Sequence, residues 1–172
     1  MNSFVRESWE SGSRGGADAY DAWVHKLKEA QGSDWCPGKT PQGIFNASLR
    51  HKVIGDINVI ESRCDPCTGY RTAAHANRID EPSVIFLTYL EGGENIEFGG
   101  ERYSLAAGDT FVWDSSKATK FEVYESLHKV ALAITLPSKS FNGSPSNVLV
   151  SAESPFHSNV RSPSLPGSAI AP

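Results

Sequence analysis

Apolar and polar residues follow a helical period near the N-terminus of the chain. In the segment 17–30, four large apolar residues recur at spacings of three and four, and these are Tyr20, Trp23, Val24 and Leu27. This spacing places them along one face of an α-helix, and Asp18 can cap the start of that helix. The pattern therefore predicts an amphipathic helix whose apolar face packs against the rest of the domain.

From residue 44 to residue 137 the pattern changes to short extended segments separated by turn residues. Strands are expected near 44–50, 54–62, 68–75, 83–90, 94–98, 101–105, 110–113, 119–124 and 128–136. Many short strands at such spacing are typical of an all-β barrel or sandwich. The strands at 83–90 and 128–136 are nearly continuous apolar runs, which predicts central strands covered on both faces.

Double glycines divide the clearest part of this β region. Gly92-Gly93 and Gly99-Gly100 flank a segment in which Ile96 and Phe98 alternate with polar residues, and this arrangement predicts a β-meander. Further on, Gly108-Asp109 is expected to form the turn of a hairpin between the strands at 101–105 and 110–113. In that turn Gly108 takes a positive φ and Asp109 bonds nearby backbone amides.

Composition divides the chain into three regions. The segment 141–172 holds eight Ser and five of the ten Pro, so it is expected to be a disordered Ser/Pro-rich tail or linker. The domain organisation predicted is a helix and loop over 1–40, a β domain over 41–140, and this tail.

Charge and cysteine usage narrow the functional classes. A net charge of −4 and a pI near 5.7 leave no basic face for duplex DNA. No segment approaches the roughly 20 apolar residues of a membrane span, and no secretion signal is visible. Three cysteines, an odd number, are read as free thiols, and a cytoplasmic location is expected.

The β region resembles a known regulatory domain. Its features are Arg71-Thr72 after the third strand, "YLEGG" at a strand end, "GGERYSLAAGD" and the "VWDSS" that follows. Their order and spacing are similar to the N-terminal ligand-binding domain of AraC/XylS-type transcriptional regulators, over roughly Phe45 to Pro137. The resemblance implies a mainly β fold, a cupin-like barrel of the double-stranded β-helix or jelly-roll type, whose mouth holds a small ligand.

The departure from that family suggests what is missing. Family members continue into a dimerisation helix and two helix-turn-helix units, whereas this sequence becomes Ser- and Pro-rich after "LAITLPSKSF". We therefore expect an effector-binding and dimerisation domain that forms a homodimer, is not an enzyme and does not itself bind DNA. It is either a truncated regulator or a stand-alone barrel that titrates a full-length regulator.

Metal chemistry is the alternative that a cupin-like barrel raises. Metal-binding cupins place a His three residues after the turn Gly, where this chain has Phe111, and they carry a second His where this chain has Asn77. Only His75 and Glu81 remain of the usual ligands, so no metal, no cofactor and no catalytic residue is predicted. A degenerate cupin isomerase or oxygenase using His75 and Glu81 remains the enzymatic alternative.

Two further motifs bear on chemistry. Cys64 and Cys67 form a CxxC, but an extended segment follows them and no second cysteine pair is present, so a turn with two incidental thiols is favoured over a redox or zinc site. No nucleophile-elbow sequence is present.

A binding pocket for a small-molecule effector remains as the predicted function. Arg71 and His75 lie in a segment of small and polar residues where packing does not require them, so they could hold a carboxylate; the alternative is that both project into solvent. Phe86 and Thr88 share one face of their strand, Trp113 and Phe111 likewise share a face, and the alternative for each aromatic is that it belongs to the core. The predicted ligand-binding residues are therefore Arg71, His75, Phe86, Thr88 and Trp113.

Overall fold

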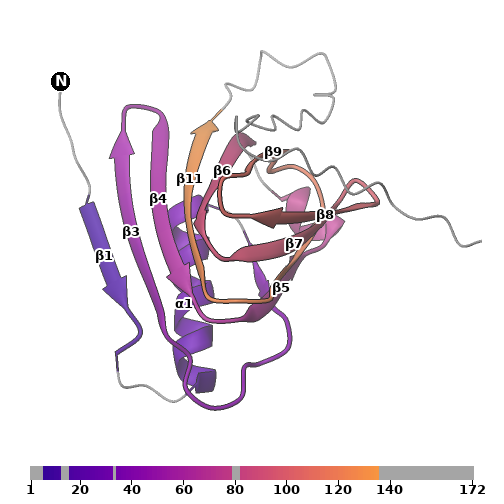
Figure 1. Cartoon of the computed structure of the whole chain (residues 1–172). Helices are drawn as coiled ribbons and strands as arrows, with labels where there is room; N and C mark the ends of the chain where they lie inside the picture. The colour runs from indigo at the N-terminus through magenta and orange to yellow at the C-terminus, as the bar shows by residue number, and fades with distance from the viewer. Residues whose placement is uncertain (1–5, 13–15, 33, 79–81, 136–172) are drawn as a thin grey trace, which may run out of the picture.

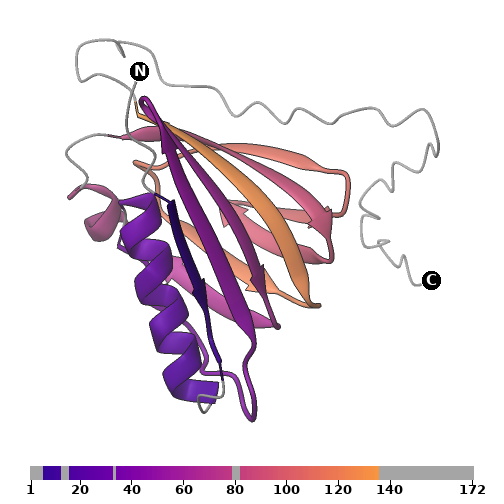
Figure 2. The same ribbon diagram turned by 90° about the vertical axis from the view of Figure 1, so that its left-hand side faces the viewer.

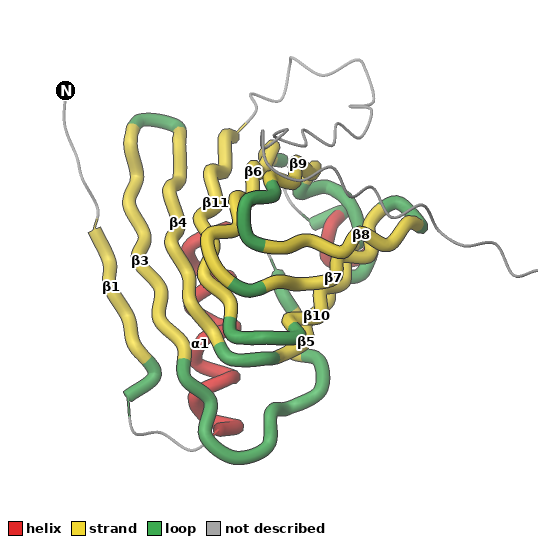
Figure 3. Tube along the Cα trace, viewed as in Figure 1, coloured by secondary structure: helices red, strands yellow, loops and turns green. Residues whose placement is uncertain are grey.

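Two antiparallel β-sheets enclose a single core in the computed structural model, which describes residues 6–12, 16–32, 34–78 and 82–135 (Figures 1 and 3). One sheet has six strands in the order β1-β3-β4-β11-β6-β9, and the other has five in the order β2-β5-β10-β7-β8. The strands of the larger sheet are β1 (Arg6–Glu10), β3 (Ala47–Ile54), β4 (Ile57–Cys64), β6 (Ser83–Glu91), β9 (Thr110–Asp114) and β11 (Leu127–Thr135). Those of the smaller sheet are β2 (Cys36–Pro37), β5 (Cys67–Arg71), β7 (Gly93–Phe98), β8 (Glu101–Ala106) and β10 (Thr119–Val123).

The amphipathic helix is present as α1 (Gly16–Gln31) and packs against β3 and β4 of the larger sheet (Figure 2). All four predicted stripe residues are buried, with Tyr20 and Trp23 at most 2% exposed. Asp18 lies inside the first turn, so the prediction that it caps the helix is wrong. Its negative charge there still stabilises the helix, because it lies near the positive end of the helix dipole. The Tyr20 hydroxyl donates to the Thr68 carbonyl and so joins α1 to the smaller sheet.

Several predicted strand limits shift in the structure. β3 and β4 form a hairpin whose turn is at Gly55-Asp56, later than the sequence predicted, because the hydrogen-bonded ladder continues through polar residues. The segment 68–75 was expected to be one strand, but β5 ends at Arg71 and the short helix α2 (Ala73–Ala76) follows. The Thr72 hydroxyl caps α2 by accepting from the His75 amide at 3.3 Å. Sequence patterns did not reveal β1 or β2.

The predicted meander is only partly correct. β7 and β8 do form a hairpin across Gly99-Gly100, which have φ values of 62° and 85°. β6, however, lies in the other sheet, and β8 and β9 also belong to different sheets. The prediction of a hairpin at Gly108-Asp109 is therefore wrong, since this turn carries the chain across the sandwich. Its local geometry is as expected: Gly108 has a φ of 97°, and the Asp109 carboxylate accepts from the Ala106 amide at 2.9 Å.

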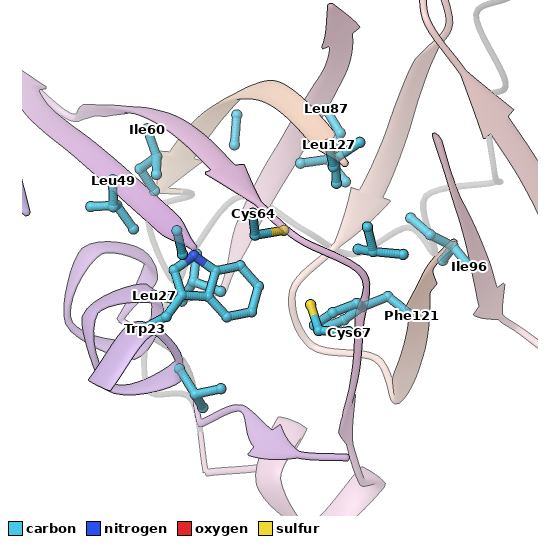
Figure 4. Close-up of a cluster of buried hydrophobic side chains, with 14 of the residues drawn as sticks. Trp23, Leu27, Leu49, Ile60, Cys64, Cys67, Leu87, Ile96, Phe121 and Leu127 are labelled. Carbon is cyan, nitrogen blue, oxygen red and sulfur yellow. The ribbon is translucent and has the colours of Figure 1, made fainter. Parts of the chain in front are cut away.

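Aromatic and aliphatic side chains from α1 and both sheets fill the space between the layers (Figure 4). The Trp23 ring makes edge contacts with Phe45 and Phe121, with ring centroids 5.8 and 6.3 Å apart. Cys64 and Cys67 also point into this core, and each is 5% exposed. Because α1 closes one side of the sandwich, the helix and the two sheets share a single apolar core.

The outer face of the six-stranded sheet is less covered than the sequence suggested. Leu132 in β11 is 39% exposed and Leu90 in β6 is 47% exposed. The expectation that these two strands are covered on both faces is therefore wrong, because the smaller sheet packs against one face only. No helix in the described ranges is long and apolar enough to cross a membrane. The predicted tail at 141–172 lies outside the described residues.

Candidate functional site

An open cleft lies at one end of the smaller sheet, with a volume of about 520 Å³. The end of β5, the turn between β7 and β8, and the loop between β9 and β10 form its walls. From β5 and its continuation come Tyr70, Arg71 and Thr72, and from the opposite loop come Lys117, Ala118 and Thr119. These segments are far apart in the sequence, and the pairing of β10 with both β5 and β7 brings them together.

Arg71 is the buried charge in the wall of this cleft. Its side chain points to the inner face of β5, and the residue is only 1% exposed. Nη2 donates to the Lys117 carbonyl at 2.9 Å, whereas Nε and Nη1 have no hydrogen-bond partner among the described residues. Buried polar groups in folded proteins are normally paired. Arg71 is therefore a buried cation with two hydrogen-bond donors that the described residues do not use.

Two indole rings flank the Arg71 guanidinium. Its central carbon lies 4.9 Å from the centroid of Trp113 and 5.5 Å from that of Trp35. Trp113 Nε1 is also buried without a partner among the described residues, while Trp35 Nε1 donates to Gln31 at 2.7 Å. The indoles hold the guanidinium by cation–π contact.

Burial lowers the pKa of Arg71 to about 10, and the nearby Asp114 carboxylate opposes this effect. The guanidinium therefore stays charged at neutral pH, although its solvation is reduced. No carboxylate in the described part of the chain forms an ion pair with Arg71. A carboxylate or another planar anion would supply both charge and acceptor atoms, because guanidinium geometry matches such groups.

Two ion pairs lie on the outer wall of the cleft. Lys120 contacts Glu97 at 3.2 Å, and Arg102 contacts Glu122 at 2.8 Å. All four side chains are about half-exposed or more, so these ion pairs contribute little energy. Arg71 differs from them in being both buried and, among the described residues, without an acidic partner.

Trp113 joins Arg71 as predicted, but the other expected ligand-binding residues lie elsewhere. Phe86 pairs with Val112 and Thr88 with Thr110 across β6 and β9, and the Thr88 and Thr110 hydroxyls lie 3.2 Å apart. In this register Phe86 and Thr88 occupy the outer face, while Trp113 faces the core. The structure therefore does not bring Phe86 and Thr88 together with Arg71 and Trp113, because side chains on opposite faces of one sheet cannot meet.

His75 lies behind the wall of the cleft. Its Nδ1 is 3.1 Å from the hydroxyl of Thr72, which lines the cleft, and 3.5 Å from the thiol of Cys36. The imidazole is therefore placed by α2 and does not share the surroundings of Arg71.

Sequence reasoning missed Trp35, which lies in a loop without a periodic pattern. It also missed a buried polar cluster in the core, where Lys129 and the Tyr89 hydroxyl both bond Glu94 Oε1, at 2.5 and 2.6 Å. Burial and the neighbouring Glu94 carboxylate raise the pKa of Tyr89 well above its usual range. Each residue of this cluster lies in a strand whose inward and outward positions alternate. The sequence could therefore have predicted which face each residue is on, but not which residues it contacts.

The structure also shows the surroundings of the residues that were considered for metal binding. Phe111 is 3% exposed, and its ring packs against Tyr103 and Phe98 at centroid distances of 5.0 and 6.1 Å. His75 bonds Thr72 instead of facing Phe111, and Glu81 lies outside the described residues. Within the described ranges, no three His, Cys, Asp or Glu side chains are grouped as a metal site.

Solved structures with this architecture identify the fold. The AraC-like transcriptional activator CuxR aligns with a TM-score of 0.63 over 76% of this chain and 47% of its own, at 12% sequence identity. The fold is cupin-like. Weaker matches include a predicted oxalate decarboxylase from Thermotoga maritima, at a TM-score of 0.43 and 17% identity over 55% of this chain and 84% of that one.

The cupin domain of Cnp3 from Schizosaccharomyces pombe also matches, at a TM-score of 0.43 and 7% identity over 55% of this chain and 67% of that one. The chain spans about half the length of CuxR. No protein-family model matches the sequence, and no curated protein matches it. The cupin-like fold that the sequence predicted is thus confirmed, as is its likeness in fold to an AraC-type regulator.

Proposed function

We propose that the chain is an effector-binding domain of a transcription regulator, and that Arg71 binds an anionic group of the effector. The observation that supports this proposal is a cation 1% exposed, in the wall of a cleft, with two N–H groups that have no partner among the described residues. The shared fold with an AraC-like activator supports the regulatory part of the proposal. Binding and not catalysis is proposed, since the described residues in contact with Arg71 form an anion anchor and include no nucleophile or general base.

Intrinsic fluorescence provides a direct binding test, because Trp35 and Trp113 both contact the guanidinium. The full chain would be titrated with a panel of small mono- and dicarboxylates, each compared with its neutral amide. At least one carboxylate should change the emission saturably, whereas its amide should not. Arg71→Met should abolish the response.

Lys26→Met is the control, since Lys26 lies on α1, is not part of the cleft lining, and pairs with Glu29 at 2.6 Å. This variant should bind like the wild type. An Arg71→Met protein that retains the wild-type affinity would show that the anion binds elsewhere.

We also propose that two copies of the chain associate through the outer face of the six-stranded sheet. Leu132 lies opposite Val59 on β4 and Phe86 on β6, and Ile57 lies opposite Ile54. Ile54, Ile57 and Leu132 are 37 to 46% exposed, so adjacent strands present one apolar surface of the kind that mediates association.

Light scattering at several protein concentrations tests this association. Leu132→Asp should yield a monomer, whereas Ile44→Asp, at an exposed apolar residue outside the strands, should leave a dimer. A wild-type monomer at all concentrations would contradict this part of the proposal without affecting the effector site.

A further inference from the structure

The three cysteines of the chain have different surroundings. Cys64 and Cys67 are buried in the core, and both are free thiols. The contact with Cys64, together with burial, raises the pKa of Cys67 well above its usual range, which makes that thiol unreactive. Cys36, on the edge strand β2, is a free thiol that is partly exposed.

Cys36 has an imidazole beside it. Its sulfur lies 3.5 Å from His75 Nδ1 and 3.9 Å from Nε2. The Thr72 hydroxyl lies 3.1 Å from the same Nδ1 and also caps α2, so the helix and its cap fix the ring next to the thiol. A thiol within hydrogen-bond reach of a base is the arrangement that activates a cysteine nucleophile.

This pair adjoins the candidate effector site. Thr72 lines the cleft, and Trp35, the residue before Cys36, lies against the buried Arg71, whose Nε and Nη1 have no partner among the described residues. Cys36 pairs across β2 and β5 with Tyr70, which also lines the cleft. Cys36 therefore lies on an edge strand next to the part of the cleft wall that contains Arg71.

We propose that Cys36 is a modification site for soft carbon electrophiles, with α,β-unsaturated carbonyl compounds as the chemical class. With its Nδ1–H donated to the Thr72 hydroxyl, His75 takes the thiol proton at Nε2 as the sulfur attacks the β-carbon. The carbon–sulfur bond forms, the carbon–carbon π pair moves to the α-carbon, and the proton held by His75 is returned there. Sulfur, carbon and protons balance in this addition without any oxidant.

The positions of the other thiols favour addition over a disulfide cycle. A cysteine that is oxidised reversibly to a disulfide needs a second thiol within reach. Cys64 and Cys67 are buried in the core (Figure 4), whereas Cys36 lies on the edge strand β2 opposite the exposed Tyr70, and the sequence holds three cysteines in all.

N-ethylmaleimide, a Michael acceptor, is the probe for the test. The folded full chain would be treated with limiting reagent, and adducts would be followed by intact mass and peptide mapping. A single adduct at Cys36 is expected, forming at least about tenfold faster than with glutathione under the same conditions, as general-base assistance permits. Cys36→Ser should remove it.

His75→Gln should slow the reaction at least about fivefold, a modest share of what a positioned base contributes. His25→Gln is the control, because His25 is an exposed residue of α1 that pairs with Glu29, and it should react like the wild type. Unchanged labelling of His75→Gln, or equal labelling of Cys64 or Cys67, would overturn the proposal.

A second measurement covers the case in which His75→Gln unfolds. The rate at Cys36 in the wild type would be compared between the folded protein and the protein in guanidinium chloride at the same pH. A higher rate in the folded protein would support activation of the Cys36 thiol by the folded structure, and a lower rate would overturn the proposal.

Discussion

Replacing Arg71 by methionine should destabilise the ligand-free protein only modestly, although Arg71 is buried. A pKa lowered from 12.5 to about 10 corresponds to a penalty of at most about 3.5 kcal/mol for keeping the guanidinium charged in the folded state, at about 1.4 kcal/mol per pKa unit. The open cleft makes the real penalty smaller through solvent screening. Because the pKa of this base is depressed, the penalty is present in full below pH 10 and is relieved only as the pH rises above 10.

The interactions lost in Arg71→Met are of similar size. The hydrogen bond to the Lys117 carbonyl contributes about 1.5 to 3 kcal/mol as a bond from a charged donor, and each indole contact about 0.5 to 2 kcal/mol. Methionine recovers part of this by packing its thioether against the same rings. The lost contacts exceed the relieved penalty over part of this range, and methionine packing offsets part of the difference. We therefore expect a loss in unfolding free energy below about 3 kcal/mol, smaller than the roughly 3 to 5 kcal/mol expected on breaking a buried structural ion pair.

Urea unfolding at pH 7, followed by circular dichroism, measures this difference without relying on the tryptophans. A loss above about 3 kcal/mol would show that Arg71 is a structural residue and would refute the reasoning. An effector at about 100 times its Kd should add about 2.7 kcal/mol to the wild type, and it should add nothing to the variant.

Three further outcomes are expected. Gly108→Ala should lower the melting temperature, because a φ of 97° costs a residue with a Cβ about 1 kcal/mol or more; the control Ala107→Ser, at the exposed neighbouring position of the same turn, should have little effect. Phe111→His should melt earlier and gain no stabilisation from zinc or manganese, because the described residues hold no group of metal ligands, and tight stoichiometric metal binding would contradict this. The purified chain should give no sequence-specific footprint on duplex DNA at physiological salt, as its net charge of −4 indicates.

The sequence predicted structure best where the spacing of apolar residues within one element is enough to define that element. The α1 stripe could be predicted because helical spacing and burial of Tyr20 and Trp23 coincide within a single helix. The assignment of strands to sheets could not, since a glycine turn such as Gly108-Asp109 has the same local geometry in a hairpin and in a crossover between sheets. Only the pairing of β8 with β7 and of β9 with β6 decides it.

In the candidate site, too, the sequence predicted what one segment determines and missed what the pairing of strands determines. Arg71 could be identified because a cation in a segment of small residues has no packing role, and its partner Trp113 was also named. Phe86 was wrongly placed beside them because β6 carries apolar residues on both faces, so hydrophobicity did not reveal which face meets the core. Trp35 could not be found, as its position depends on the pairing of β2 with β5.

Arg71 and Lys129 are both inward-facing cations of the β-sandwich, and the contrast between them indicates why Arg71 is more than a packing residue. Lys129 bonds the fully buried Glu94 at 2.5 Å, so its charge is neutralised within the core. Arg71 is equally part of the inner face, yet in the described part of the chain it has one carbonyl acceptor and no carboxylate partner. Since this fold can provide a buried acid for a buried cation, the lack of an acidic partner for Arg71 among the described residues, in the wall of an open cleft, supports the proposal that Arg71 binds an anion.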